Sequence, residues 1–180
     1  NACLVLNDCG SIYMNLPNAA ARITNNTVMD PVGNLDGVPL EHFTMAQGIY
    51  LDDFSSNVYV TGNTIAGADH GLHLHNGTAN VVEGNSLYGN RRTQLWMQED
   101  TKKLRASGDV WQNHVAGNRI FPTSATASIR HDTLFASTSA FSSYAGNRYS
   151  ALLSPVIATE AWAGGSGAYQ LAEWQAPEAV

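Results

Sequence analysis

The chain has 180 residues, of which 44% are hydrophobic, and it carries a formal net charge of -6 with only 9 lysines and arginines. This length predicts one domain with a sizeable core. The scarcity of cations argues against a nucleic-acid partner, whose phosphates need clustered positive charge. No apolar run reaches the roughly 18 residues that would cross a bilayer, so we expect no membrane partner. A neutral or hydroxyl-rich partner fits this composition better.

The first residues and the cysteines say little about compartment. The chain opens on strand-like residues from Ala2 to Leu6 and lacks a basic start followed by an apolar signal core. We therefore expect this chain to be a piece of a longer protein. Cys3 and Cys9 are the only cysteines, and their spacing predicts neither a disulfide framework nor a metal site. We expect two ordinary thiols rather than a bridge.

One short unit recurs along the chain in the form apolar-x-x-Asn-x-apolar. Its asparagines are Asn26, Asn63, Asn85, Asn118 and Asn147, and glycine precedes four of them. The shortest interval, between Asn63 and Asn85, is close to one bare coil of a solenoid, and the longer intervals require loops at the corners. Asparagine tolerates left-handed corner geometry, and its amide can bond a copy above and below. The repeat therefore predicts an asparagine ladder.

A second strand-like piece precedes each ladder asparagine. These pieces span residues 11–15, 48–53, 71–76, 94–99 and 128–133. The first three lie at a nearly constant distance from their asparagine, whereas the last two require insertions. Period-2 alternation places one apolar set inside, namely Ile12, Met14, Ile49, Leu51, Leu72, Leu74, Leu95 and Met97. A β-sandwich with Asn-Gly turns is the competing interpretation, but it predicts no aligned columns.

The sequence thus predicts an all-β protein, a parallel β-helix of about five coils over residues 1–153. Residues 154–180 are expected to form an exit or capping segment, and the whole is a candidate fragment of a longer helix. Nothing in the sequence indicates an oligomeric state.

Stacking the second set of strands places two columns side by side on the outer face. The first column contains Tyr13, Tyr50, His73, Trp96 and Arg130. The second column contains Asn15, Asp52, His75, Gln98 and Asp132. Aromatic faces stack on sugar rings, while carboxylates, amides and imidazoles bond their hydroxyl groups. This outward strip therefore predicts a groove for a polysaccharide or oligosaccharide.

Asp52 is the first candidate for chemistry on that strip. Hydrolysis of a glycosidic bond needs one carboxylic acid and one carboxylate that acts as base or nucleophile. The partner of Asp52 is Asp53, Asp132 or Glu99. Adjacent strand residues point to opposite faces, so Asp53 shares the groove only if it already lies at the corner, where a plain turn residue is the alternative.

His73 and His75 fall on one strand and one face. Either imidazole could act as a general base or orient a carboxylate, and a hydrogen-bonded surface pair is the alternative. A metal site would need a third ligand such as Asp52. We expect no required metal or cofactor, while a divalent cation stays open.

Arg130 and Tyr50 suggest a different chemistry, β-elimination from a uronate. There a cation neutralises the carboxylate while a base removes a proton. Trp96 could serve as a sugar platform or pack under the loop that follows it.

Residues 48–63 and 71–85 resemble bacterial and phage-type right-handed β-helix repeat proteins of the pectate-lyase-like superfamily. The resemblance covers about residues 10–150, and residues 169–175 resemble the last segment of such proteins. It implies a right-handed helix, a carbohydrate substrate and an extracellular or periplasmic location. The superfamily includes glycoside hydrolases, polysaccharide lyases, uronate epimerases and tailspike depolymerases.

Two subfamilies are similar around Asp52. In β-helical xylosidases a Gly-Ile-x-Leu-Asp strand carries a catalytic aspartate at the position of Asp52, although the acid glutamate of the next coil is replaced here by His75. In polygalacturonases an Asp-Asp pair is followed one coil later by a catalytic histidine, which resembles Asp52, Asp53 and His75. The leading hypothesis is therefore a glycan hydrolase. A uronate lyase or epimerase is the second, and a non-catalytic glycan-binding or structural helix is the third.

Overall fold

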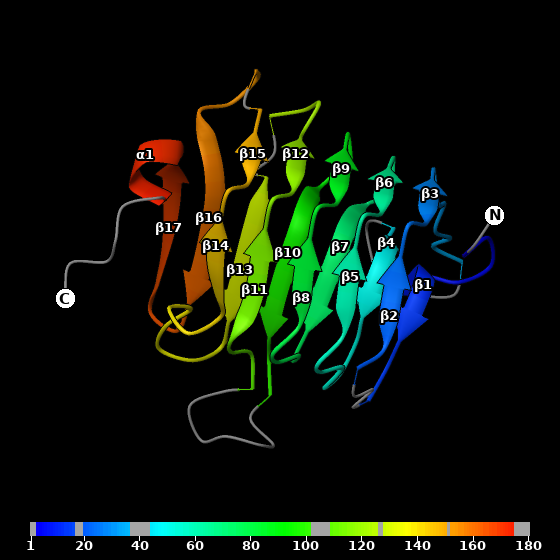
Figure 1. Ribbon diagram of the computed structural model, residues 1–180, viewed down its shortest axis with the longest axis horizontal. Coiled ribbons are helices and arrows are strands. Elements are labelled where there is room, and N and C mark those ends of the chain that lie inside the picture. Colours follow the sequence, from blue (N-terminus) through cyan, green and yellow to red (C-terminus); the bar gives the residue numbers. More distant parts are fainter. Residues whose placement is uncertain are drawn as a thin grey trace.

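The computed structural model describes residues 3–16, 20–36, 44–101, 109–125, 128–150 and 152–174. Three strands make up each coil of the described chain (Figure 1). The first two coils contain β1 (Cys9–Met14), β2 (Arg22–Thr24), β3 (Thr27–Met29), β4 (Ala46–Leu51), β5 (Tyr59–Thr61) and β6 (Thr64–Ala66). The next three contain β7 (His70–His75), β8 (Val81–Glu83), β9 (Ser86–Tyr88), β10 (Thr93–Glu99), β11 (Asn113–Ala116), β12 (Arg119–Phe121), β13 (Ile129–Thr133), β14 (Ser142–Ala145) and β15 (Arg148–Tyr149).

Equivalent strands of successive coils pair in parallel and form three long sheets. The first sheet has the order β1-β4-β7-β10-β13-β16-β17, and the other two have the orders β14-β11-β8-β5-β2 and β15-β12-β9-β6-β3. Each coil thus lies against the next along a single axis (Figure 1). The predicted parallel β-helix is confirmed, and the aligned columns rule out the sandwich.

The core runs along the axis between the three sheets. Ile49, Leu72 and Leu95 are fully buried and lie in one register across β4, β7 and β10. Each coil leaves its apolar side chains half covered until the next coil stacks on them, so burial here depends on repetition. The inward set expected from alternation is confirmed.

The asparagine ladder is continuous from Asn26 to Asn147. Each ladder asparagine donates hydrogen bonds from its backbone N–H and its side-chain Nδ2 to the Oδ1 of the next one, at 2.9–3.0 Å. The left-handed corner residue is the one before the asparagine: Gly62 has φ 67° and Asn25 has φ 56°. We expected the ladder asparagine itself to adopt the left-handed conformation, and this expectation is wrong. The preceding residue adopts it, and glycine does so without a Cβ clash, which leaves the asparagine side chain free to bond its neighbours.

A second asparagine column was not predicted. Asn113 accepts from the backbone N–H of Asn80 at 3.0 Å, and Asn80 accepts from that of Val58 at 3.0 Å. The two asparagines are 33 residues apart and lie at the corner before the second sheet. Asn113 fits the apolar-x-x-Asn-x-apolar pattern, with Val110 and Val115 at the apolar positions, whereas Asn80 has Gly77 at the first of them. One match alone did not reveal a second column.

The chain leaves the solenoid through a hairpin and one helical turn. The strand β16 (Val156–Trp162) pairs in parallel with β13, β17 (Gly165–Gln170) turns back antiparallel against β16, and α1 (Leu171–Trp174) follows. An antiparallel last strand ends the parallel stacking on that sheet. The boundary expected after residue 153 stays a prediction.

Cys3 and Cys9 form a disulfide, with their Cα atoms 6.0 Å apart. The expectation of two ordinary thiols is wrong, because the backbone turns back between them: the N–H of Leu6 donates to the carbonyl of Cys3. Spacing along the sequence did not reveal this turn, which brings the two Cα atoms within the range that a disulfide spans. In the described part of the chain, no helix is long and apolar enough to cross a membrane.

Candidate active site on the first sheet

The two predicted columns exist in the register expected for them. Tyr13 pairs with Tyr50, Tyr50 with His73, His73 with Trp96 and Trp96 with Arg130. In the second column Gln98 pairs with both His75 and Asp132. The register of the last two coils, which the sequence left loose, therefore matches the prediction.

The middle of the first column is buried rather than solvent-facing. The ring of His73 stacks between Tyr50, at 4.6 Å between centroids, and Trp96, at 4.0 Å. Their exposed fractions are only 0–7%, whereas Tyr13 is 49% exposed at the end of the column. Neighbouring strands lie about 4.8 Å apart, close enough for flat rings to cover one another's faces. The expected free sugar platforms at Tyr50 and Trp96 are thus largely occupied by neighbouring rings.

Asp52 lies at the centre of a hydrogen-bond network. Its Oδ2 accepts from the Tyr13 hydroxyl at 2.5 Å and from Asn15 Nδ2 at 3.1 Å, and its Oδ1 accepts from the backbone N–H of Asp53 at 2.8 Å. Burial alone would raise the pKa of Asp52, but the hydrogen bonds from Tyr13, His75 and the Asp53 amide lower it to about 2. Asp52 is therefore ionised throughout the physiological pH range.

The imidazole of His75 lies between the carboxylates of Asp52 and Asp100. Its Nδ1 is 2.8 Å from Oδ1 of Asp52, and its Nε2 is 3.0 Å from Oδ2 of Asp100. Burial lowers the pKa of His75, but the hydrogen bonds and charges of both aspartates outweigh it, so the pKa is raised above its ordinary value. The cationic imidazolium has a proton on each nitrogen: Nδ1 bonds Asp52, while Nε2 forms an ion pair with Asp100 without a hydrogen bond of good geometry.

Asn76 connects the carboxylates of Asp53 and Asp100 at the strand end. Its Nδ2 donates to Oδ1 of Asp53 at 2.8 Å and to Oδ1 of Asp100 at 2.9 Å, while its Oδ1 accepts from the Asp100 backbone N–H. The side chains of Asp53 and Asp100 are 41% and 42% exposed. Because their oxygens contact one nitrogen, the two carboxylates face the same small, solvent-accessible space.

Asp132 and Arg130 on β13 form a separate group with Trp96 on β10. Oδ2 of Asp132 accepts from the Trp96 indole N–H at 2.7 Å and lies 2.6 Å from Nε of Arg130. The Arg130 guanidinium also lies over the Trp96 ring, at 5.0 Å. Asp132 is paired with Arg130. It is not part of the Asp52 cluster, which consists of Asp52, Asp53, His75, Asn76 and Asp100.

Glu99 faces away from the strip. It is 2% exposed, and its carboxylate accepts from the Val110 backbone N–H and the Thr133 hydroxyl, both at 2.8 Å. Strand alternation turns Glu99 to the face opposite Gln98. Its expected place in the groove is therefore corrected: it anchors the chain that returns at Val110.

Three ligand atoms of Asp52, Asp53 and His75 lie within 4.8 Å of one another, close enough for a cation. The Nδ1 of His75 already faces Asp52, so an ion would have to displace its proton. We assign no metal to these residues, and the expectation that none is required stays a prediction.

Asp100 and Asn76 were absent from the predicted site. Asn76 ends the His-x-His strand, and Asp100 follows β10 by one residue. Both lie where strands end at one edge of the sheet, and that shared position was the available signal. The sequence concealed it because the long insertion after Glu99 shifts the spacing of this coil.

Comparison with known proteins bears on the fold. No curated protein and no solved structure matches the chain significantly. A family model described as right handed beta helix region matches residues 5–148, so the chain belongs to the right-handed β-helix family.

Proposed function

We propose that this protein cleaves glycosidic bonds in a polysaccharide or oligosaccharide by hydrolysis. The observation that carries the proposal is the arrangement of His75 between Asp52 and Asp100, beside the half-exposed carboxylate of Asp53. A proton donor and a carboxylate nucleophile or base at one accessible edge are the two groups that glycoside hydrolysis requires.

Asp100 and His75 together form the proposed acid. Hydrogen bonds from Asn76 and His75 outweigh burial and lower the pKa of Asp100, so the shared proton resides on His75. When the glycosidic bond breaks, the proton moves from Nε2 of His75 to Asp100 and on to the leaving oxygen. Asp53 attacks the anomeric carbon and forms a covalent glycosyl ester, which water then hydrolyses. The water proton returns through Asp100 to His75 and restores the starting state.

Asp52 is a positioning residue in this scheme. Its ionised carboxylate holds Nδ1–H of His75, and Nε2 of the same ring lies 3.0 Å from Oδ2 of Asp100. Tyr13 and Asn15 fix Asp52 from the neighbouring coil. We assign His73, which is fully buried between two rings, to holding β7 in place rather than to contact with substrate.

The alternative chemistries have less support. Elimination from a uronate needs a free cation for the carboxylate, and Arg130 is already paired with Asp132. A purely adhesive or structural helix has no need for an imidazolium shared by two aspartates. The disulfide between Cys3 and Cys9 supports the proposed extracellular or periplasmic location, because such bridges persist in oxidising compartments.

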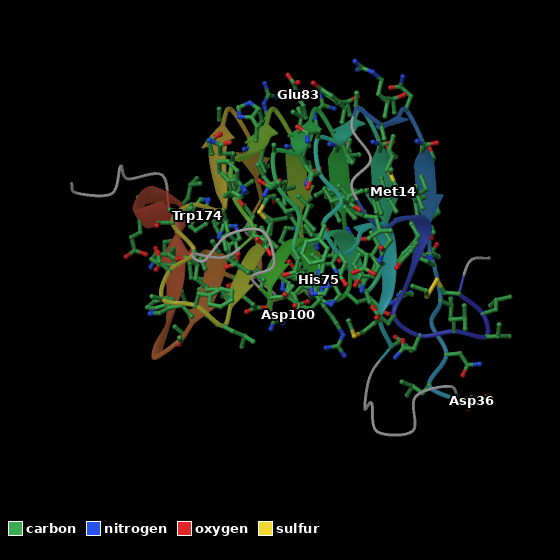
Figure 2. All side chains as sticks on the ribbon, turned by 90° about the horizontal axis from the view of Figure 1, so that it is seen from below. Met14, Asp36, His75, Glu83, Asp100 and Trp174 are labelled. Carbon is green, nitrogen blue, oxygen red and sulfur yellow. A yellow bond between two sulfur atoms is a disulfide. The ribbon has the colours of Figure 1, made fainter. Side chains whose placement is uncertain are left out.

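The deciding experiment compares products from a panel of neutral and acidic polysaccharides. Hydrolysis gives new reducing ends without ultraviolet absorbance, whereas elimination adds the absorbance of an unsaturated sugar. We expect Asp100→Asn to lower the rate about 10²–10⁴-fold, the usual loss when a general acid is removed. Asp36→Asn, far from the cluster (Figure 2), is the matched control and should leave the rate unchanged. Absorbing products, or full activity in Asp100→Asn, would contradict the proposal.

A further inference from the structure

A cavity lies at the C-terminal end of the solenoid, away from Asp52, His75 and Asp100. It has a volume of about 280 Å³, and His131, Thr138, Tyr144, Glu160, Tyr169 and Trp174 are among its lining residues. An adjoining hollow shares Ser142, Tyr144 and Trp174 with it. Figure 2 shows Trp174 well separated from His75 and Asp100, so the cavity belongs to a different part of the molecule.

Three aromatic rings from three elements form its walls. The ring of Trp174 on α1 lies 5.2 Å from Tyr144 on β14 and 5.8 Å from Tyr169 on β17, with interplanar angles of 66° and 49°. All three side chains are partly exposed. Tilted, partly exposed rings beside a cavity offer apolar surface to the C–H face of a small ring.

Polar groups converge on the same space. Oε1 of Glu160 accepts from the Thr138 hydroxyl at 2.6 Å and lies 3.0 Å from Nδ1 of His131. The Ser142 hydroxyl oxygen and the Trp174 indole nitrogen are buried beside the hydroxyl groups of Tyr144 and Tyr149, but neither makes a hydrogen bond of good geometry. A buried polar group left in that state carries a desolvation penalty. A ligand that bonds both groups would remove this penalty.

We propose that the cavity binds one neutral, hydroxyl-rich ring, the monosaccharide unit of a glycan. Its volume is near the lower limit of the roughly 300–1,000 Å³ found for ligand sites, which suits one ring rather than a chain of sugars. The carboxylates of Glu160 and Glu173 line it and none of its lining residues is Lys or Arg, so an acidic sugar is disfavoured.

The indole N–H of Trp174 favours a sugar over an organic cation, which is the other class of ligand that a cavity with aromatic and acidic walls can bind. This group only donates, so it needs an acceptor such as a sugar hydroxyl, and a quaternary ammonium ion has none. The proposal is independent of the catalytic one, because no residue of the Asp52 cluster lines the cavity.

The test is a binding titration of the full chain with methyl glycosides of neutral monosaccharides, with glucuronate, and with choline chloride. Saturation-transfer NMR and calorimetry report binding whether or not the protein cleaves glycans. We expect at least one neutral glycoside to bind, and Tyr169→Ala and Ser142→Ala each to weaken it by about tenfold. Circular dichroism checks that each variant is folded.

Two control variants test whether the measured binding takes place in this cavity. Tyr88 is 56% exposed on β9 and does not line the cavity, so Tyr88→Ala should bind as the wild type does. Tyr13→Ala alters the strip and should also leave binding unchanged. Binding that is lost in Tyr13→Ala but kept in Tyr169→Ala and Ser142→Ala would overturn the proposal. So would binding of choline or glucuronate alone, or of no probe at all.

Discussion

The charge on Asp52 controls the protonation of its neighbour. Asp52 stays ionised with a pKa of about 2, and its negative charge is one reason why the pKa of His75 is raised. A histidine with a raised pKa keeps its proton to higher pH. In the proposed reaction this proton goes to the leaving group, so activity is present below the pKa of His75 and is lost as pH rises through it.

Asp52→Asn should move that alkaline limit to lower pH. The amide keeps the size of the side chain but removes the anion, so the pKa of His75 falls. The measurement is the pH profile of kcat/KM for the variant and the wild type, with Asp36→Asn as control. A uniform loss of activity with an unmoved alkaline limit would mean that Asp52 has only a structural role.

The spacing of Asp53 and Asp100 predicts the stereochemistry of the product. Their oxygens lie 2.8 and 2.9 Å from one Asn76 nitrogen. In retaining glycosidases the two catalytic carboxyl groups lie roughly 5–5.5 Å apart, whereas in inverting enzymes a gap of roughly 6.5–9.5 Å admits an attacking water. The closeness of Asp53 and Asp100 favours the retaining arrangement. We expect retention of anomeric configuration, observed by following the first product by proton NMR before mutarotation. Inversion would exclude Asp53 as the nucleophile.

Among the structural elements, the asparagine ladder stabilises the coils through buried hydrogen bonds. Asn85 is fully buried, donates to Val60 and Asn118, and accepts twice from Asn63. Its replacement leaves several buried backbone and side-chain groups without partners, and each such group costs about 1–3 kcal/mol.

Asn85→Ala should therefore lower the free energy of unfolding by about 3 kcal/mol. Asn26 is the matched control, because it donates to Asn63 but accepts from no ladder asparagine among the described residues. We expect Asn26→Ala to cost about 1 kcal/mol. Urea denaturation of both variants makes the comparison. Equal losses would show that the column contributes no more in its middle than at its end.

Sequence periodicity predicted the strands and ladder well, because a solenoid repeats the same local environment in each coil. Ile49, Leu72 and Leu95 follow one alternation, and the strip register came from it. Burial of His73 was not predictable in this way, because it depends on the flat faces of Tyr50 and Trp96 in adjacent coils. Asp100 was missed because its role depends on where an inserted loop begins.

At the scale of the whole molecule, the solenoid is quasi-one-dimensional, so disturbance of one end should spread only to neighbouring coils. The Cys3–Cys9 bridge lies beside the first coil, and Cys9 begins β1. The same strand presents Tyr13, and Asn15 follows it directly; both residues hold Asp52 of the next coil. The bridge is thereby linked to the proposed site through a single strand.

Removal of the bridge should loosen the first coil and leave the middle of the molecule intact. A bridge that closes so short a loop contributes about 2 kcal/mol in the chain-entropy model. That loss falls on β1, which among the described residues pairs with β4 alone in its sheet. We expect hydrogen exchange in the Cys3→Ser/Cys9→Ser variant to quicken in β1 while β10 and β11 exchange as in the wild type. The alkaline limit of activity should also shift down, because a mobile Tyr13 holds Asp52 less firmly. Unchanged exchange in β1 would show that parallel pairing with β4 alone fixes this strand, and the bridge would then have no part in ordering the site.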